Sequence, residues 1–304
     1  MSVYNGEPER RGPVRAGAGS PPTNTQLAGC SQTVNIAFIS RKGGVGKTTC
    51  TVNLAAALAA RGRRVLVLDL DAQSSASLSL GVDRRHLAPS MADVLLSGRP
   101  LRETIRRTGV EGLDLVTGST DLATLEVALA SNRQRELCLC RPLASIRGEY
   151  DFVFMDCPAG IGLLSTSALV GADAYVVPVA PQFLILSGLA NFLDAVDRLC
   201  YHLQIRPRLL GVLLTQVDYR VKVTRDYVDS LRADLNDRIF GIEVRVNVRL
   251  AEAPSLGQTI FQYDRQATGA RAFKLLSEEF LLRCGMEVPA EGTEEAVAVP
   301  AGVA

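Results

Sequence analysis

The stretch Arg41-Lys42-Gly43-Gly44-Val45-Gly46-Lys47-Thr48-Thr49 decides the fold of this chain. It follows the apolar, β-branched residues 34–40, which read as a buried strand, and precedes the apolar residues 51–60, which read as a helix. Strand, glycine-rich loop and helix, in this order, form the context that a phosphate-binding loop requires. Glycines let consecutive backbone N–H groups turn inward around an oxyanion, and the helix N-terminus adds its positive dipole end. We therefore predict a nucleotide site in which Lys47 contacts the β- and γ-phosphates and the Thr48 hydroxyl contacts Mg²⁺.

One lysine of this loop departs from the standard pattern. In G-x-x-x-x-G-K-[ST] the leading glycine would fall on Arg41, and a second lysine, Lys42, stands just inside the loop. A lysine there crowds the glycines of its own loop and has no obvious phosphate to reach in its own subunit. A phosphate reached across a dimer interface explains Lys42 better than the alternative, a loop charge that only faces solvent.

The composition bounds the fold class. At 304 residues the chain is long enough for one large α/β domain or two ordinary ones, and 47% of its residues are apolar. Aromatic residues are scarce and the aliphatic runs are short, which suits parallel strands covered by helices on both faces. Runs such as 209–214 are far too short to cross a bilayer, and the N-terminus lacks the hydrophobic segment of a signal peptide. We therefore expect a cytoplasmic protein.

Charge and cysteine usage exclude further classes. The net charge of +1 gives no argument for nucleic acid, so any such binding must come from a local patch. The seven cysteines are odd in number, scattered and without Cys-x-x-Cys spacing, which favours reduced, mostly buried thiols over disulfides or a metal site. The same spacing argues against an iron–sulfur carrier, a class of protein that shares the loop.

Three segments divide the chain. We predict a disordered N-terminal tail over 1–33, one P-loop domain over 34–285, and a flexible acidic tail over 286–304. Strand-like and helix-like segments alternate through the middle, which favours an α/β fold with a single doubly wound, mostly parallel sheet and helices on both faces, the P-loop NTPase fold. The strand candidates are 34–40, 64–70, 112–116, 151–156, 174–179, 208–214 and 241–246. The helix candidates are 48–61, 121–130, 133–147, 187–203, 224–238 and 266–284.

Acidic side chains end two of the predicted strands. Asp69 and Asp71 close the apolar strand that begins near Arg64, and Asp156 closes a second hydrophobic strand candidate, 151–156. Because side chains alternate along a strand, Asp69 and Asp71 should project to the same side. Carboxylates at the phosphate end of a sheet can hold Mg²⁺ directly or through water and can orient an attacking water. A single such acid is more often a cap or turn residue, but three acids after a phosphate loop favour a site.

These motifs together resemble the ParA/MinD group of deviant-Walker ATPases, and within it the Soj-like, ParA-type partition proteins. The loop 42–49 resembles the signature of the group, and residues 65–73 are similar to its second motif. Residues 156–159 are similar to its Mg²⁺-associated motif, and residues 247–260 closely resemble the stretch that closes ParA-type sheets. The resemblance covers residues 34 to 284, which is nearly everything outside the two tails.

The resemblance implies roles for individual residues. Lys42 would contact the nucleotide of the partner subunit in a homodimer with ATP sandwiched at the interface. Thr48 would bind Mg²⁺ with Asp156 assisting through water. Asp71 would position and polarise the hydrolytic water, with Asp69 a weaker candidate near the metal. The catalytic residues would be Lys42 and Asp71. The nucleotide-binding residues would be Lys42, Gly43, Gly44, Val45, Gly46, Lys47, Thr48, Thr49 and, beside the base, Asn247.

The resemblance also implies binding to DNA phosphates without reading bases. The two arginines that match the family's DNA contacts are Arg220 and Arg249. Lys222 and Arg225 lie close to Arg220 in sequence, and a dimer would double the set into a positive surface. Such binding would be independent of sequence and strongly sensitive to salt. The alternative is an ordinary solvated face, because the predicted helix there also carries Asp226, Asp229, Asp234 and Asp237.

Three positions depart from the family pattern. Ala72 and Ala159 stand where the family usually has proline, which changes the stiffness of two loops more than their chemistry. Arg245-Val246 precedes Asn247 where Pro-Arg is common, which leaves base selectivity open.

The function implied is an ATP-dependent dimeric switch that binds non-specific DNA for plasmid or chromosome partition. Its slow ATPase activity would be stimulated by a ParB-like centromere-binding partner, and it would be nucleoid-associated. One alternative is a MinD-like membrane switch, which needs a basic amphipathic C-terminal helix, whereas the segment past Gly285 is acidic and interrupted by proline. Another alternative is a ParA-like ATPase that positions a different cargo on the nucleoid.

Overall fold

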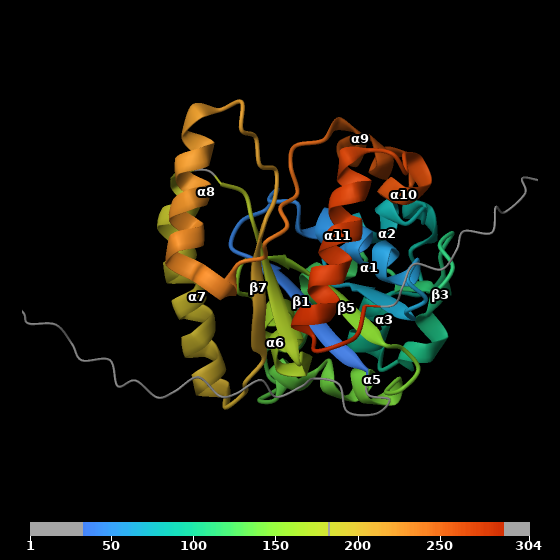
Figure 1. The fold of residues 1–304 in the computed structure, drawn as a ribbon. Coiled ribbons are helices and arrows are strands. Elements are labelled where there is room, and N and C mark those ends of the chain that lie inside the picture. Colours follow the sequence, from blue (N-terminus) through green and yellow to red (C-terminus); the bar gives the residue numbers. More distant parts are fainter. Residues whose placement is uncertain (1–32, 182, 289–304) are drawn as a thin grey trace, which may run out of the picture.

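The computed structural model describes residues 33–181 and 183–288, with side chains described at all of these except 183–187. A seven-stranded sheet in the order β3-β4-β2-β5-β1-β6-β7 forms the centre of the molecule (Figure 1). Neighbouring strands pair in parallel, apart from β3 and β4, which are antiparallel. The predicted mostly parallel α/β sheet is therefore confirmed. The strands are β1 (Val34–Ser40), β2 (Val65–Asp69), β3 (Arg106–Arg107), β4 (Leu113–Val116), β5 (Phe152–Ala159), β6 (Ala174–Val179) and β7 (Arg208–Leu214).

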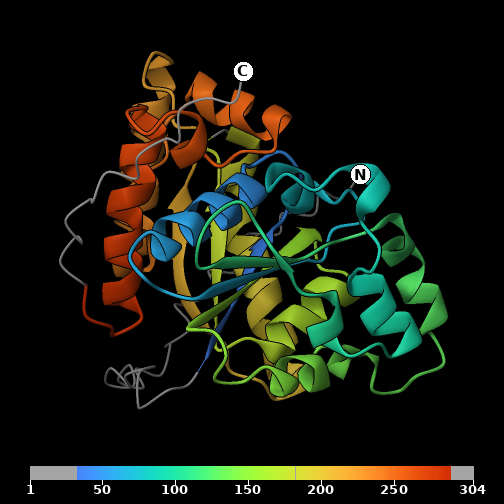
Figure 2. The same ribbon diagram turned by 90° about the vertical axis from the view of Figure 1, so that its right-hand side faces the viewer.

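Helices cover both faces of this sheet, as the two views at right angles show (Figures 1 and 2). One face packs against α1 (Lys47–Ala59), α2 (Ser75–Ser79), α9 (Val248–Glu252), α10 (Ile260–Tyr263) and α11 (Thr268–Arg283). The other face packs against α3 (Met91–Ser97), α4 (Leu125–Ala128), α5 (Cys140–Ser145), α6 (Leu163–Gly171), α7 (Phe183–Leu203) and α8 (Lys222–Leu235).

The alternation of side chains along β1 explains why two helical layers are needed. Ile36 and Phe38 belong to the core beneath α1 and α11, whereas Ala37 and Ile39 belong to the core on the opposite face. All four are buried, so neither face of the strand is left to solvent. The Phe38 and Phe154 rings pack with centroids 5.0 Å apart, which fixes β1 against β5 on the side of the phosphate-binding loop.

The strand prediction over 241–246 is wrong. This segment runs beside the end of β7, but within the described residues it forms only a single bridge, between Arg245 and Val217. Its first backbone N–H groups, at Gly241 and Ile242, donate instead to the Glu279 carboxylate at 2.8 and 2.9 Å. A side chain of α11 therefore satisfies donors that a further strand would have used.

Several helical elements differ from the sequence-based expectation. The candidates 121–130 and 133–147 are broken into short turns and helices rather than continuous, and the edge strand β3 was not expected. Helix α6 is buried from Leu163 to Leu169, including its polar residues Ser165, Thr166 and Ser167, so it has no solvent-facing polar stripe that periodicity could reveal. The two predicted tails lie almost entirely in 1–32 and 289–304, outside the described residues, and stay predictions. Within 33–181 and 183–288 no helix combines the length and apolarity needed to span a membrane.

Candidate active site

The loop between β1 and α1 has the shape of a phosphate cradle. Gly44 and Gly46 adopt left-handed backbone conformations with φ of 78° and 76°, which other residues rarely adopt. A Cβ built at Gly43 or Gly44 would meet no atom within 4 Å, so the exposed side of the loop is open. Gly46 is the N-cap of α1 and provides no side-chain cap, which leaves the first N–H groups of the helix for an anion.

Lys47, at the start of α1, forms a buried ion pair with Asp156 of β5. The Lys47 Nζ atom lies 2.9 Å from Asp156 Oδ1, and the two side chains are 8% and 0% exposed. Burial lowers the pKa of Lys47, but the charge and hydrogen bond of Asp156 outweigh it and hold this pKa above its ordinary value. Lys47 is therefore a fixed positive charge below the glycine loop.

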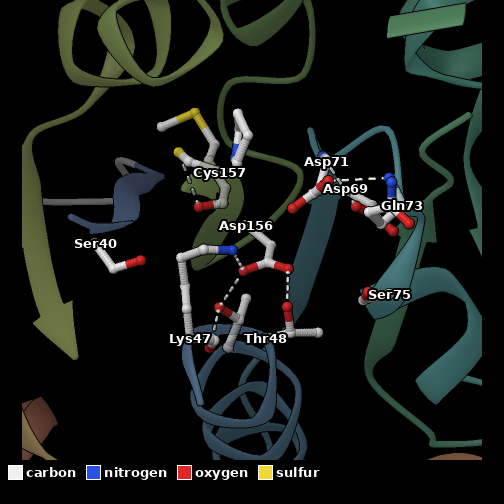
Figure 3. A network of polar contacts seen from close by, with 12 residues as sticks. Ser40, Lys47, Thr48, Asp69, Asp71, Gln73, Ser75, Asp156 and Cys157 are labelled. Atoms are coloured by element: carbon white, nitrogen blue, oxygen red, sulfur yellow. Dashed lines mark hydrogen bonds and ion pairs between the residues drawn. The ribbon is translucent and has the colours of Figure 1, made fainter. Parts of the chain in front are cut away.

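Thr48 completes an oxygen-rich corner beside this pair. Its hydroxyl donates to Asp156 Oδ2 at 2.7 Å, and the Thr51 hydroxyl donates to Asp156 Oδ1 at 3.1 Å. Figure 3 shows Lys47, Thr48 and Asp156 pointing toward one another. A hydroxyl next to a carboxylate at the end of a strand is a donor set that suits Mg²⁺. The chemistry of these residues therefore fits a magnesium ion, which Thr48 would hold with Asp156 beside it.

The structure gives Asp69 and Asp71 different surroundings. Asp69 is fully buried at the end of β2 and accepts hydrogen bonds from Ser77 N (2.8 Å), Ser77 Oγ (2.6 Å) and Asp71 N (3.2 Å). Burial and the nearby charge of Asp156 raise the pKa of Asp69 to about 7, while the bonds from Ser77 oppose this rise. These contacts orient Asp69 toward α2, so it shapes the loop that carries Asp71.

Asp71 is half-buried and lies nearer the phosphate side. Its Oδ1 atom accepts from the backbone N–H of Gln73 at 2.9 Å, which fixes the side chain in the loop. Figure 3 shows the Asp71 carboxylate on the side that faces Asp156. Its charge also contributes to the raised pKa of Lys47. The geometry thus brings Asp71 together with Lys47 and Asp156, as the motif order suggested.

Lys42 is exposed on the outer side of the loop. Its backbone carbonyl accepts from the Ser40 hydroxyl at 3.1 Å, which holds the backbone while the side chain faces solvent. With Arg41 it borders a small cavity against α7 that is also lined by Leu189 and Phe192. An exposed amine at this position is able to reach a second molecule.

An open pocket of about 310 Å³ adjoins the phosphate loop on the side of β7. Asn247 lies in its wall, where it caps α9 by accepting from Leu250 N at 3.2 Å and donates to Thr268 Oγ1 at 2.7 Å. The structure therefore brings Asn247 beside the loop. The pocket is lined by Gly46, Thr49, Cys50, Thr215, Gln216, Val244, Arg245, Val246, Asn247, Leu250 and Ala251.

Sequence reasoning missed Thr215 and Gln216. Both side chains contact carbonyl groups of the phosphate loop, and both residues line the pocket. The available signal was their position, because they directly follow a parallel strand and ligands bind at the carboxyl ends of such strands.

The basic residues of the predicted DNA surface gather near α8 and α9, which Figure 1 shows at the same upper end of the molecule. Arg220 is bound by Asp218 through two contacts of 2.8 Å, and Arg249 lies 3.0 Å from Glu252. Both arginines are more than half exposed, at 81% and 54%. The two arginines are therefore accessible but partly neutralised by neighbouring carboxylates.

Lys222 and Arg225 lie in the first turn of α8, and Arg225 lies over the ring of Tyr219. Arg225 lies 5.7 Å from the centroid of this ring, and Arg245 lies 4.9 Å from it. The acidic residues of the solvated-face alternative are exposed as well. Three of the four predicted basic residues thus lie at or just before the start of α8, and the fourth, Arg249, lies on α9.

Comparison with known proteins places these observations in a family. A family model described as an AAA domain matches residues 33–209. The chain is 36% identical to the sporulation initiation inhibitor protein Soj of Bacillus subtilis over 80% of this chain and 96% of that protein. It is 35% identical to the chromosome partitioning protein ParA of Caulobacter vibrioides over 82% of this chain and 94% of that protein.

Two solved structures share the fold. Cobyrinic acid a,c-diamide synthase from Mycobacterium smegmatis, with bound ADP and magnesium, has a TM-score of 0.70 and 31% identity, with 84% of this chain and 98% of that chain covered. The septum site-determining protein MinD from Pyrococcus horikoshii, complexed with Mg-ADP, has a TM-score of 0.67 and 29% identity. The match covers 81% of this chain and 95% of that chain.

Proposed function

This chain belongs to the ParA/MinD family of deviant-Walker ATPases, in its Soj-like, ParA-type branch, and from this premise we propose that it is an ATP-dependent, dimeric DNA-binding switch for chromosome or plasmid partition. The observation that carries the proposal is the buried Lys47–Asp156 pair, with the Thr48 hydroxyl bound to it, beneath an open glycine loop. It supplies a positive charge and oxygen ligands where a nucleotide triphosphate and a metal ion need them.

The nucleotide is held by residues of the loop and the adjoining pocket. Backbone N–H groups of residues 42–49 surround the phosphates of ATP, and Lys47 neutralises part of their charge. Asn247 contacts the base from the wall of the pocket. Thr48, with Asp156 assisting through water, would hold Mg²⁺, and the chemistry that this ion would supply is neutralisation of the charge on the phosphates.

Hydrolysis depends on Asp71 and Lys42. Asp71 positions and polarises the water that attacks the γ-phosphate, since its carboxylate is fixed in the loop by Gln73 and lies near Lys47. The exposed Lys42 reaches the phosphates of the second subunit, so that two copies close around ATP. The loop carries no evident arginine that stabilises the transition state within one subunit, and slow turnover follows.

The ATP-bound dimer binds DNA phosphates through the exposed side chains of Arg220, Lys222, Arg225 and Arg249. A ParB-like partner stimulates hydrolysis and releases the protein from the nucleoid.

The likeness to MinD also fits a membrane-associated switch. Sedimentation with anionic liposomes and ATP separates the two, because robust pelleting would favour the membrane function. A neighbouring gene for a centromere-binding protein would separate partition from the positioning of another cargo.

DNA retention tests the proposal directly. We expect retention of the wild type with ATP and Mg²⁺ but little with ADP or without nucleotide. Lys47→Ala should lose both ATP binding and retention, whereas Arg249→Ala should lose retention and keep ATP binding. Asp71→Ala should keep ATP-dependent dimerisation and retention while turnover stops. Retention of the wild type that is equal with ATP and ADP, or normal turnover in Asp71→Ala, would contradict the proposal.

A further inference from the structure

Two side chains that follow β7 hold the phosphate-binding loop from the side. The Thr215 hydroxyl donates to the carbonyl of Val45 at 2.7 Å, and the Gln216 Nε2 atom donates to the carbonyl of Gly44 at 2.7 Å. These are consecutive residues bound to consecutive carbonyls, so the loop is attached to the end of β7 at two points. The Thr215 bond is buried, whereas Gln216 and Gly44 are both exposed.

The backbone of Gln216 has an uncommon conformation that its neighbours enforce. Its φ of 51° lies in the left-handed region, which a residue with a side chain adopts only at a cost. The next residue, Val217, donates to the carbonyl of Val244 at 3.2 Å and accepts from Val246 N at 3.1 Å. These two bonds fix the chain after Gln216. The side-chain amide of Gln216 is thereby directed to the Gly44 carbonyl, and the same side chain lines the pocket that Asn247 also lines.

The same segment continues directly into the basic surface, that is, the exposed residues Arg220, Lys222, Arg225 and Arg249. Tyr219, three residues after Gln216, donates its hydroxyl to Glu243 at 2.8 Å, and its ring is flanked by Arg225 and Arg245. Arg220 follows immediately in the sequence. One short stretch, 215–220, therefore touches the phosphate loop at one end and organises the arginines at the other, at the end of the molecule where α8 begins in Figure 1.

We propose that Gln216 is a positioning residue that couples the state of the phosphate loop to the basic surface. The inference rests on the proposed nucleotide-dependent binding of DNA. The two-state element is the hydrogen bond from the Gln216 amide to the Gly44 carbonyl. This carbonyl belongs to the segment beside Lys42, which a triphosphate and a second subunit contact, whereas the carbonyl of Val45 is fixed in the interior by Thr215. The exposed bond is thus the one that a rearrangement of the loop makes or breaks.

Because the bond between Gln216 and Gly44 is exposed, its loss should affect the coupling of the two surfaces more than the stability of the fold. A hydrogen bond between exposed groups exchanges readily with water and adds little to the stability of the fold. A bond retained for stability alone would be expected in the interior, as the Thr215 bond is. Removal of the Gln216 amide should therefore leave the protein folded and change the link between the two surfaces.

The coupling is measurable as a reciprocal effect. If ATP tightens DNA binding by a certain factor relative to ADP, then DNA must tighten ATP binding relative to ADP by the same factor. We expect Gln216→Leu, which keeps the size of the side chain but cannot donate, to reduce both factors by up to about five-fold, the upper bound that one ordinary hydrogen bond sets. Fluorescence anisotropy of labelled DNA and of a labelled nucleotide gives the two factors, in the Asp71→Ala background that prevents turnover.

A matched control and a rescue variant make the test specific. Gln204 also has a left-handed backbone, with φ of 56°, and is exposed at the end of α7, so Gln204→Leu should leave both factors unchanged. Gln216→Lys restores a long side chain with a donor and should recover most of the coupling. Light scattering with ATP should show that Gln216→Leu still dimerises, which excludes loss of the dimer as the cause.

The outcomes distinguish this inference from the proposed function. If the wild type binds DNA equally with ATP and ADP, the proposed switch itself fails. If the wild type shows the difference and Gln216→Leu keeps it in full, the switch stands and the role of Gln216 is refuted. A variant that loses dimerisation, or a loss that Gln216→Lys does not recover, would also overturn the coupling role.

Discussion

The phosphate-binding region and the basic surface use ion pairs in opposite ways. In the first, Lys47 and Asp156 are buried and Asp156 also accepts from two threonine hydroxyls. In the second, Arg220 and Asp218 face solvent, with Arg220 81% exposed. A buried pair is costly to disturb because neither charge can turn to water, whereas an exposed pair exchanges its partner cheaply. The first region is therefore built for a fixed geometry, and the second for a partner that binds and leaves.

The largest expected effect comes from breaking the buried pair. Asp156→Ala leaves the Lys47 ammonium, 8% exposed, without its counter-ion, and we expect a loss of about 3 to 5 kcal/mol in the free energy of unfolding. Urea denaturation measures this loss. The double variant Lys47→Ala/Asp156→Ala should lose less than the two single variants together, because no unpaired charge remains. If Asp156→Ala costs less than about 1 kcal/mol, the pair behaves like a surface pair and the contrast fails.

A second test uses the other buried acid, Asp69. Its pKa is raised from 3.8 in the unfolded chain to about 7 in the folded protein. Between these two pH values, the folded state therefore keeps a proton on Asp69 that the unfolded state has released. The free energy of unfolding should therefore fall as the pH rises from 3.8 to about 7, by up to about 1.4 kcal/mol per pH unit. Asp69→Asn should flatten this dependence in urea titrations at several pH values.

The contribution of Ser77 provides the control for this dependence. Hydrogen bonds from Ser77 favour the charged form of Asp69 and oppose the rise in its pKa. Ser77→Ala should therefore extend the decline in stability to higher pH, while Asp69→Asn/Ser77→Ala should show no such decline. A wild-type profile that rises between pH 4 and 7 and is unchanged in Asp69→Asn would show that Asp69 is charged in the folded state.

The sequence predicted the local parts of the phosphate-binding region well. The strand over 34–40 has the observed bounds of β1, because its apolar pattern and the glycine loop that follows are both local signals. The bonds that fix the site were not predictable in this way. Ser77 lies eight residues from Asp69, and Gln216 lies 172 residues from Gly44, so neither pairing leaves a periodic pattern. The wrong strand over 241–246 has the same origin, since Glu279 of α11 takes its first donors.

The basic surface shows a different limit of sequence reasoning. Positive residues were found by counting charges and by resemblance, but their acidic partners decide how much positive charge is available. Glu252, for example, accepts from both Arg249 and the Tyr263 hydroxyl, at 3.0 and 2.8 Å. Which carboxylate faces which arginine follows from turns and helix starts, and only the folded chain supplies this information.

The smallest expected effect is a gain, and it tests the exposed side of the contrast. Asp218 holds Arg220 through both oxygens, so a DNA phosphate must replace it. Asp218→Asn removes the competing charge, and we expect DNA affinity with ATP to rise by about two- to five-fold at low salt. The gain should shrink as salt increases, because screening weakens exposed charges.

The pair of Asp83 and Arg85 gives a closely matched control for this gain. Arg85 binds Asp83 through the same three atoms as Arg220 binds Asp218, at 2.8 to 3.0 Å, but in the connection between α2 and α3. Asp83→Asn changes the net charge identically and should leave DNA affinity almost unchanged. An equal gain in the two variants would mean that net charge alone governs binding, whereas a loss in Asp218→Asn would mean that the carboxylate holds Arg220 in its binding position. In either case the exposed ion pair would not be the exchangeable partner that the contrast with Lys47 and Asp156 requires.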